Sequence, residues 1–254
     1  MKSPNRVHTP KALRLLLFYK FISLPNFELY AEKHLAFCRA LGVRGRILVA
    51  AEGINGTLTG TPDQCDAYMN AMQMDERFAD VMFKVDEVDE HQFPRISVKP
   101  VRSLINFGEA DGIDPNEITG EHLEPMRFFE ELRNEDVIVL DGRTDYEWDE
   151  GHFKNAIRPD VKTFREFPRW IRKHFKDYKH KRVLTYCTGG IRCEKLTGYL
   201  INEGFDNVAQ LRGGIVAYLK DEHTDKNLFE GKMYVFDDRI SIDKDEAATG
   251  EIRE

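Results

Sequence analysis

The residues whose types are best suited to chemical reaction lie between an apolar run and the expected start of a helix. The loop comprises six consecutive residues: Cys187, Thr188, Gly189, Gly190, Ile191 and Arg192. Its two glycines allow the backbone N–H groups to point inward, and the following helix adds the positive end of its dipole. With the fixed charge of Arg192 nearby, we predict that the pKa of Cys187 is lowered and that the loop cradles an anionic or persulfide sulfur.

Four further residues have two readings each. Cys193 is either a resolving thiol for Cys187 or a packed residue at a helix start. Asp141 and Arg143 follow another apolar run, where a buried Asp-Arg contact more often braces loops than takes part in catalysis. His152 is read in the same way and is left out of the site.

Composition favours two domains and a soluble protein. The chain has 254 residues, of which 41% are hydrophobic and 32% charged, and this length suits two modest cores. No apolar run approaches the roughly 18 residues of a membrane helix, and no signal peptide is recognisable, so we expect no membrane contact and a cytoplasmic location. Its four cysteines are too scattered for a disulfide framework, and no Cys/His set has zinc-ligand spacing, so we expect free thiols and no metal.

The first half has the pattern of a ferredoxin-like α+β domain, which we place at residues 1–107. Strand candidates at 15–21 and 81–85 and helix candidates at 27–41 and 63–74 enclose a hairpin candidate whose turn would contain Gly53, Asn55 and Gly56. Gly42 is expected to end the first helix, and Thr61-Pro62 to begin the second. The order β-α-β-β-α-β is that of the split βαβ fold.

The second half changes to a doubly wound α/β pattern with a parallel sheet. A stretch rich in Gly, Asp and Glu at 108–122 is the expected linker, and the domain itself should span 123–219. Apolar strand candidates at 137–140, 182–187 and 207–211 are each followed by Gly and a helix candidate. Residues 220–254 are expected to form an acidic tail.

Basic residues are concentrated between Arg158 and Arg182, although the net charge is -7. Five residues recur at helical spacing, so we expect them to form a buried stripe that leaves the charges facing outward: Phe164, Phe167, Ile171, Phe175 and Tyr178. Four of these charges are candidates for contact with a phosphate backbone: Arg169, Arg172, Lys173 and Lys176.

Three segments resemble the signatures of the rhodanese fold, in order: VIVLDGRTDYEWDEGHFKNAI, VLTYCTGGIRCEK and NVAQLRGGIVAY. Together with AEGINGT in the first half, CTGGIRCEK resembles more narrowly the tRNA uridine(34) hydroxylases, which join a ferredoxin-like (acylphosphatase-like) domain to a rhodanese domain. The resemblance implies oxygen-dependent formation of 5-hydroxyuridine at the tRNA wobble position, with Cys187 as the essential residue, tRNA as partner and molecular oxygen as co-substrate. Longer members continue into a Cys-rich segment that the matched motifs do not include.

The residues alone leave other functions open. A thiolate at Cys187 could bond to sulfur or to an electrophilic carbon, and its attack on C6 of uracil would activate C5 toward an oxidant. No flavin, haem or iron-ligand motif is recognisable, so no cofactor is identified. A sulfurtransferase that carries a persulfide to a small molecule or protein would need the same loop. A phosphatase would need one more residue between Cys187 and Arg192, and a non-enzymatic binding module would not require the cysteine.

Overall fold

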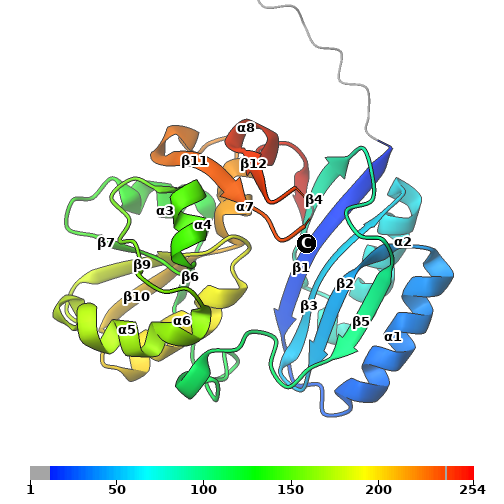
Figure 1. The fold of residues 1–254 in the computed structure, drawn as a ribbon, viewed down its shortest axis with the longest axis horizontal. Helices are drawn as coiled ribbons and strands as arrows, with labels where there is room; N and C mark the ends of the chain where they lie inside the picture. Colours follow the sequence, from blue (N-terminus) through cyan, green and yellow to red (C-terminus); the bar gives the residue numbers. More distant parts are fainter. Residues whose placement is uncertain (1–11, 238) are drawn as a thin grey trace, which may run out of the picture.

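The computed structural model describes residues 12–237 and 239–254, which form two α/β domains side by side (Figure 1). Residues 1–11, which the sequence analysis assigns to the first domain, lie outside the described residues. The N-terminal domain contains β1 (Leu13–Phe21), α1 (Phe27–Leu41), β2 (Arg44–Ala50), β3 (Gly53–Gly60), α2 (Pro62–Gln73), the 3₁₀ helix η1 (Glu76–Phe78), β4 (Phe83–Val88) and β5 (Ile96–Pro100).

The N-terminal sheet has the predicted ferredoxin-like core. Strand β1 lies between β3 and β4 and is antiparallel to both, within the strand order β13-β4-β1-β3-β2-β5. Helices α1 and α2 cover the side of the sheet that faces away from the second domain (Figure 1). The other side of the sheet is left for contact between the domains.

Local sequence explains both helices of this domain. Helix α1 ends at Gly42, whose φ of 78° lies in the left-handed region, as expected for a glycine that closes a helix. Helix α2 begins with a capping box in which the side chains of Thr61 and Gln64 each accept a backbone N–H, and Pro62 occupies the first turn.

The hairpin differs from the expectation. Asn55 and Gly56 lie inside β3, paired with Leu48 and Ile47, and the turn is formed by residues 51–52. Gly56 is needed for packing, because a Cβ there would lie 2.4 Å from the ring of Phe18. Residues that usually form turns therefore belong to a strand, and this places Asn55 on the face toward the second domain.

The second domain follows the linker, which contains η2 (Gly108–Ala110). Its elements are β6 (Glu121–Leu123), α3 (Pro125–Leu132), β7 (Ile138–Asp141), α4 (Asp145–Glu150), β8 (Gly151–Phe153), η3 (Phe164–Glu166), α5 (Phe167–His174), η4 (Lys176–Tyr178), β9 (Arg182–Tyr186), α6 (Ile191–Asn202), β10 (Asn207–Leu211) and α7 (Gly214–Lys220).

A parallel sheet of order β6-β10-β9-β7 forms the centre of this domain. One face packs against α3 and α7 through Phe128 and Tyr218, and the other packs against α5 and α6 through Ile171 and Leu200. The doubly wound α/β fold predicted from the sequence is therefore present. The reactive loop follows β9, at the carboxyl end of a central strand, where such folds usually hold their ligands.

Residues 220–254, expected to be an acidic tail, contain regular structure. They form η5 (Lys226–Leu228), β11 (Phe229–Tyr234), β12 (Ser241–Asp243), α8 (Lys244–Ala247) and β13 (Glu251–Arg253). Strand β11 pairs with β8 of the second domain, whereas β13 pairs with β4 of the N-terminal sheet. The segment thus returns the chain to its first domain. Among the described residues, no helix is both long and apolar enough to cross a membrane.

Candidate active site

The Cys187 loop curls around its own sulfur. Cys187 follows β9 directly, and α6 begins at Ile191. The backbone N–H of Gly190 donates to the Cys187 Sγ atom at 3.2 Å. The side chain is 1% exposed, so the sulfur sits in a nest of backbone donors and not in bulk water.

The electrostatics of the loop favour a thiolate. Burial raises the pKa of Cys187, but a hydrogen bond from the Cys193 thiol, the charge of Arg192 and the backbone N–H groups of both residues lower it more, to about 6. Burial raises the pKa of Cys193, which therefore keeps its proton and acts as a donor. A lowered pKa of Cys187 agrees with the expectation from the sequence. The hydrogen bond from Cys193 that contributes to it was not expected.

The start of α7 packs against the reactive loop. The N–H groups of Ile215 and Val216 donate to the carbonyl oxygens of Cys187 and Thr188 at 2.9 and 3.1 Å. Gly214 has φ of 69°, and a Cβ there would lie 2.5 Å from the Cys187 carbonyl oxygen. Only a residue without a side chain allows this approach, which gives the third sequence signature a physical reason.

Arg192 is paired with a carboxylate that the sequence analysis did not identify. Its Nη1 and Nη2 atoms donate to the two oxygens of Glu147 at 2.7 and 2.8 Å, and both side chains are nearly or fully buried. Burial raises the pKa of Glu147, but Arg192 and Thr144 lower it to about 2. The pattern Thr144-x-x-Glu147 indicates a helix cap, and nothing in it signals a partner 45 residues away.

Asp141 and Arg143 form a structural brace. Arg143 is fully buried and binds Asp141 through its backbone and guanidinium, and the Tyr186 hydroxyl donates to Asp141 at 2.6 Å. Neither residue lines the cavity described below. His152 stacks on Trp148, with ring centroids 3.4 Å apart, and it too lies outside the cavity lining.

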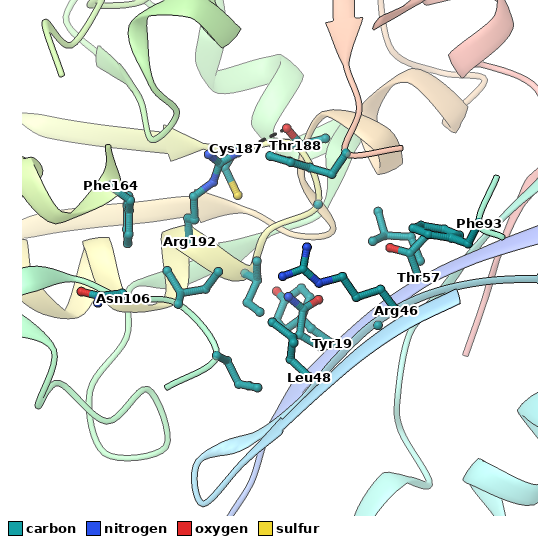
Figure 2. Close-up of a pocket in the computed structure, with 18 residues that line it drawn as sticks. Tyr19, Arg46, Leu48, Thr57, Phe93, Asn106, Phe164, Cys187, Thr188 and Arg192 are labelled. Atoms are coloured by element: carbon teal, nitrogen blue, oxygen red, sulfur yellow. Dashed lines mark hydrogen bonds between the residues drawn. The ribbon is translucent and has the colours of Figure 1, made fainter. Parts of the chain in front are cut away.

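Cys187 opens into a cavity of about 390 Å³ that both domains build. Figure 2 shows Cys187 and Arg192 on one side, with Tyr19, Arg46 and Leu48 on the strands opposite. The remaining lining residues are Leu17, Asn55, Gly56, Thr57, Phe93, Leu104, Ile105, Asn106, Phe164, Thr188, Gly189, Ile191 and Phe236. The N-terminal sheet is therefore one wall of the site, which sequence analysis placed entirely in the second domain.

Two strand residues of the N-terminal domain donate hydrogen bonds to the loop or to its helix. Lys84 donates from Nζ to the carbonyl oxygen of Gly189 at 2.9 Å, and the hydroxyl of Tyr19 donates to Glu194 of α6 at 2.8 Å. Neither residue is evident as a site residue from the sequence, because each lies inside a strand candidate with apolar neighbours and its partner is more than 100 residues away.

The basic stretch lies apart from the cavity lining. Arg169, Lys173 and Lys176 are exposed on α5 and η4, whose apolar stripe is buried as expected except for Tyr178, which is half-buried. Arg172 is instead held by Glu109 of the linker and donates to the Tyr199 hydroxyl at 2.7 Å. The four candidates for phosphate contact are therefore not equivalent, since one of them joins the linker to the second domain.

Comparisons with known proteins agree with this two-domain reading. Residues 13–104 match the family described as the UPF0176 acylphosphatase-like domain, and residues 127–221 match the rhodanese-like domain. A solved rhodanese-like domain from Anabaena is 17% identical, with a TM-score of 0.36, and covers 44% of this chain and 80% of its own. The fold of each domain is therefore identified by the family matches and not by this solved structure.

Curated relatives are similar over most of the chain. The tRNA uridine(34) hydroxylase of Bacillus licheniformis is 54% identical over 229 residues, which are 90% of this chain and 71% of that protein. The proteins of the same name from Enterococcus faecalis and Bacillus mycoides are 51% and 50% identical, and each match covers 73% of the relative. The chain therefore belongs to the tRNA uridine(34) hydroxylase family.

Proposed function

We propose that this protein is an oxygen-dependent tRNA hydroxylase that modifies C5 of the wobble uridine, with Cys187 as the reacting thiol. The observation that carries the proposal is a thiol favoured as a thiolate at the wall of a cavity built by both domains. The relatives that share at least half of their aligned residues with this chain are named for this activity.

The cavity suits a base that has left its stack. Enzymes that modify a base take it into a pocket where aromatic or apolar side chains stack on it and polar groups read its edge. Tyr19, Phe164 and Phe236 supply rings to this cavity, and the amides of Asn55 and Asn106 can both donate and accept. A uracil ring presents carbonyl oxygens and an N–H, which amide groups match.

Arg46 gives the cavity its available positive charge. Of the residues that the structure describes, two basic ones line it, Arg46 and Arg192, and the second is held by Glu147. Among the described residues, no carboxylate forms an ion pair with Arg46, and its guanidinium extends from β2 toward the Cys187 loop (Figure 2). We assign it to the phosphate of the nucleotide whose base enters the cavity.

The chemistry would begin with addition of the Cys187 thiolate to C6 of uracil, which makes C5 nucleophilic. Loss of the C5 proton and release of Cys187 would later restore the ring. One oxygen atom of O₂ enters at C5 and the other becomes water, which consumes two protons and two electrons from a reductant such as a dithiol. The neighbouring Cys193 keeps its proton and holds the Cys187 sulfur in place.

The test combines a cysteine variant with isotope labelling. We expect Cys187→Ser protein to fold as wild type and to form no 5-hydroxyuridine in tRNA, because a serine hydroxyl is a far weaker nucleophile. Wild-type protein under ¹⁸O₂ should place the label at C5, as measured by mass analysis of tRNA nucleosides. Hydroxylation by folded Cys187→Ser would contradict the role of the thiol, and label from water would contradict the use of O₂.

A sulfurtransferase remains the second candidate, because the backbone nest at Cys187 would also hold a persulfide. This function predicts a sulfane sulfur on Cys187 that is passed to an acceptor without any change in tRNA. The intact mass of the protein after incubation with thiosulfate distinguishes the two functions. A sulfurtransferase would gain the mass of one sulfur atom at Cys187, whereas the hydroxylase requires no stable persulfide.

A further inference from the structure

Lys84 is a buried cation that the N-terminal domain places against the reactive loop. It lies in β4, and its side chain is 2% exposed. Its Nζ atom donates to the Gly189 carbonyl oxygen at 2.9 Å and lies 4.9 Å from the centre of the Tyr19 ring. A buried ammonium group is costly unless an anion balances it, and a neutral carbonyl does so only in part.

The charged groups around Lys84 leave few anions to balance it. Arg212 is itself a cation and pairs with Glu124 and Glu254. On α6, the carboxylate of Glu194 already accepts from Tyr19 and His122.

The remaining anion of the loop is Cys187 itself. Over residues 12–237 and 239–254, no carboxylate lies within ion-pair distance of the Lys84 Nζ atom. Burial lowers the pKa of Lys84 to about 8, and the negative charges that oppose this are first Cys187 and then Glu194. Arg192 also faces Cys187 and lowers its pKa, although its guanidinium is bound to Glu147.

We infer that Lys84 is a positioning residue of the reactive loop, which fixes the Gly189 carbonyl and serves as the counter-charge of the Cys187 thiolate. This inference rests on the proposed function only in taking Cys187 as the reacting group. Its consequence is that the N-terminal domain does more than form a wall of the cavity. It completes the electrostatics of a thiol that belongs to the other domain.

Two variants of the full chain separate the charge of Lys84 from its hydrogen bond. Lys84→Gln keeps a donor for Gly189 without the charge, and Lys84→Met removes both. The measurement is the rate of Cys187 alkylation by iodoacetamide against pH, which needs no tRNA and therefore stands apart from any failure of the hydroxylation assay. We expect both variants to raise the alkylation midpoint by about one pH unit, because a nearby opposite charge lowers a pKa by roughly 1 to 3 units.

Lys220→Gln is the matched control. Lys220 is also a buried lysine that joins α7 to β4, but it has a carboxylate partner in Asp86. Its loss should leave the alkylation midpoint at the wild-type value. An unchanged midpoint in folded Lys84→Gln, or an equal shift in Lys220→Gln, would overturn the inference.

A reciprocal measurement keeps the inference testable even if the Lys84 variants do not fold. Coupling between two sites is mutual. Removal of the thiolate must therefore lower the pKa of Lys84 by the same amount as removal of the Lys84 charge raises the pKa of Cys187. Titration of the Lys84 side chain by NMR in wild type and in Cys187→Ser reports this shift. A Lys84 pKa that is the same in both proteins would show that the two charges are not coupled.

Discussion

Arg192 was expected to supply a fixed positive charge beside Cys187, and its guanidinium is held in place by Glu147 with two hydrogen bonds. A paired arginine exerts a weaker field on a neighbouring thiol than a free one. The lowered pKa of Cys187 therefore depends on several smaller contributions, including the Cys193 thiol and the backbone N–H groups. Charge balance in this loop has to be considered for the whole group of residues.

We predict that Arg192→Met is more harmful to stability than the double variant Arg192→Met/Glu147→Gln. The single change leaves the Glu147 carboxylate buried without its partner, at a cost of about 3–5 kcal/mol, whereas the double change removes both charges. Denaturant unfolding of the wild type, the single variant and the double variant measures this difference in stability. Arg158→Met is the surface control, because Arg158 pairs with the exposed Asp149. A double variant as unstable as the single one would contradict the prediction.

The same single variant should shift the titration of the thiol. Loss of Arg192 together with an unpaired Glu147 disfavours the thiolate, so the alkylation midpoint of Cys187 should rise from about 6 toward the free-thiol range near 8.5. Because the folded pKa lies below that of a free thiol, the thiolate stabilises the fold at pH above about 8.5, and this contribution is lost as pH falls through about 6.

At the scale of elements, the reactive loop depends on the start of α7. We predict that Gly214→Ala abolishes most of the hydroxylation although it removes no reacting group. A methyl group there would displace the carbonyl oxygens of Cys187 and Thr188, which lie within 2.6 Å of the added carbon. Mass analysis of tRNA nucleosides measures the loss, and Gly112→Ala, which meets nothing within 4 Å, is the control. Wild-type activity in folded Gly214→Ala would show that the loop tolerates the shift.

Elements that carry their own local signals could be predicted from the sequence. Helix α1 was predicted with its observed bounds because Gly42 ends it, and β10 because a short apolar run is bounded by polar residues. The predicted position of the first hairpin turn was wrong, because the composition of Gly53 to Gly56 favours a turn. Only the contact with Phe18 shows why Gly56 belongs to a strand. Strand β13 has three residues and exists through its pairing with β4, which no local pattern signals.

Whole-molecule arrangement decides which basic residues can meet tRNA. We predict that changing Arg169, Lys173 and Lys176 to Ala weakens tRNA binding and leaves Cys187 alkylation unchanged, since these exposed charges lie outside the cavity lining. Each lost phosphate contact should reduce the slope of log affinity against log salt by about 0.7 to 0.9. Arg172 is kept because it pairs with Glu109 of the linker. Unchanged affinity and slope would mean that these charges are only solvated.

The candidate site shows the same division between what is local and what depends on the whole molecule. The loop around Cys187 was predicted because its residues are consecutive in the sequence. The opposite wall was not predicted, since Tyr19, Arg46 and Lys84 reach the site only when the two domains are docked. Periodicity indicates which strand face is buried, but it does not indicate that a second domain covers that face.

Strand β13 has a consequence for how the domains could be separated. The chain leaves the N-terminal sheet after β5 and returns to it at β13, so the second domain is attached to that sheet at two points. A protease that cuts within the linker would leave the two fragments associated through the β13–β4 ladder. A gene fragment that ends before β13 would encode a sheet with β4 at its edge, a strand whose unpaired N–H and C=O groups invite pairing with another molecule. The domain boundary that is evident in the sequence is thus a poor place to divide the protein, because the first domain is made from both ends of the described chain.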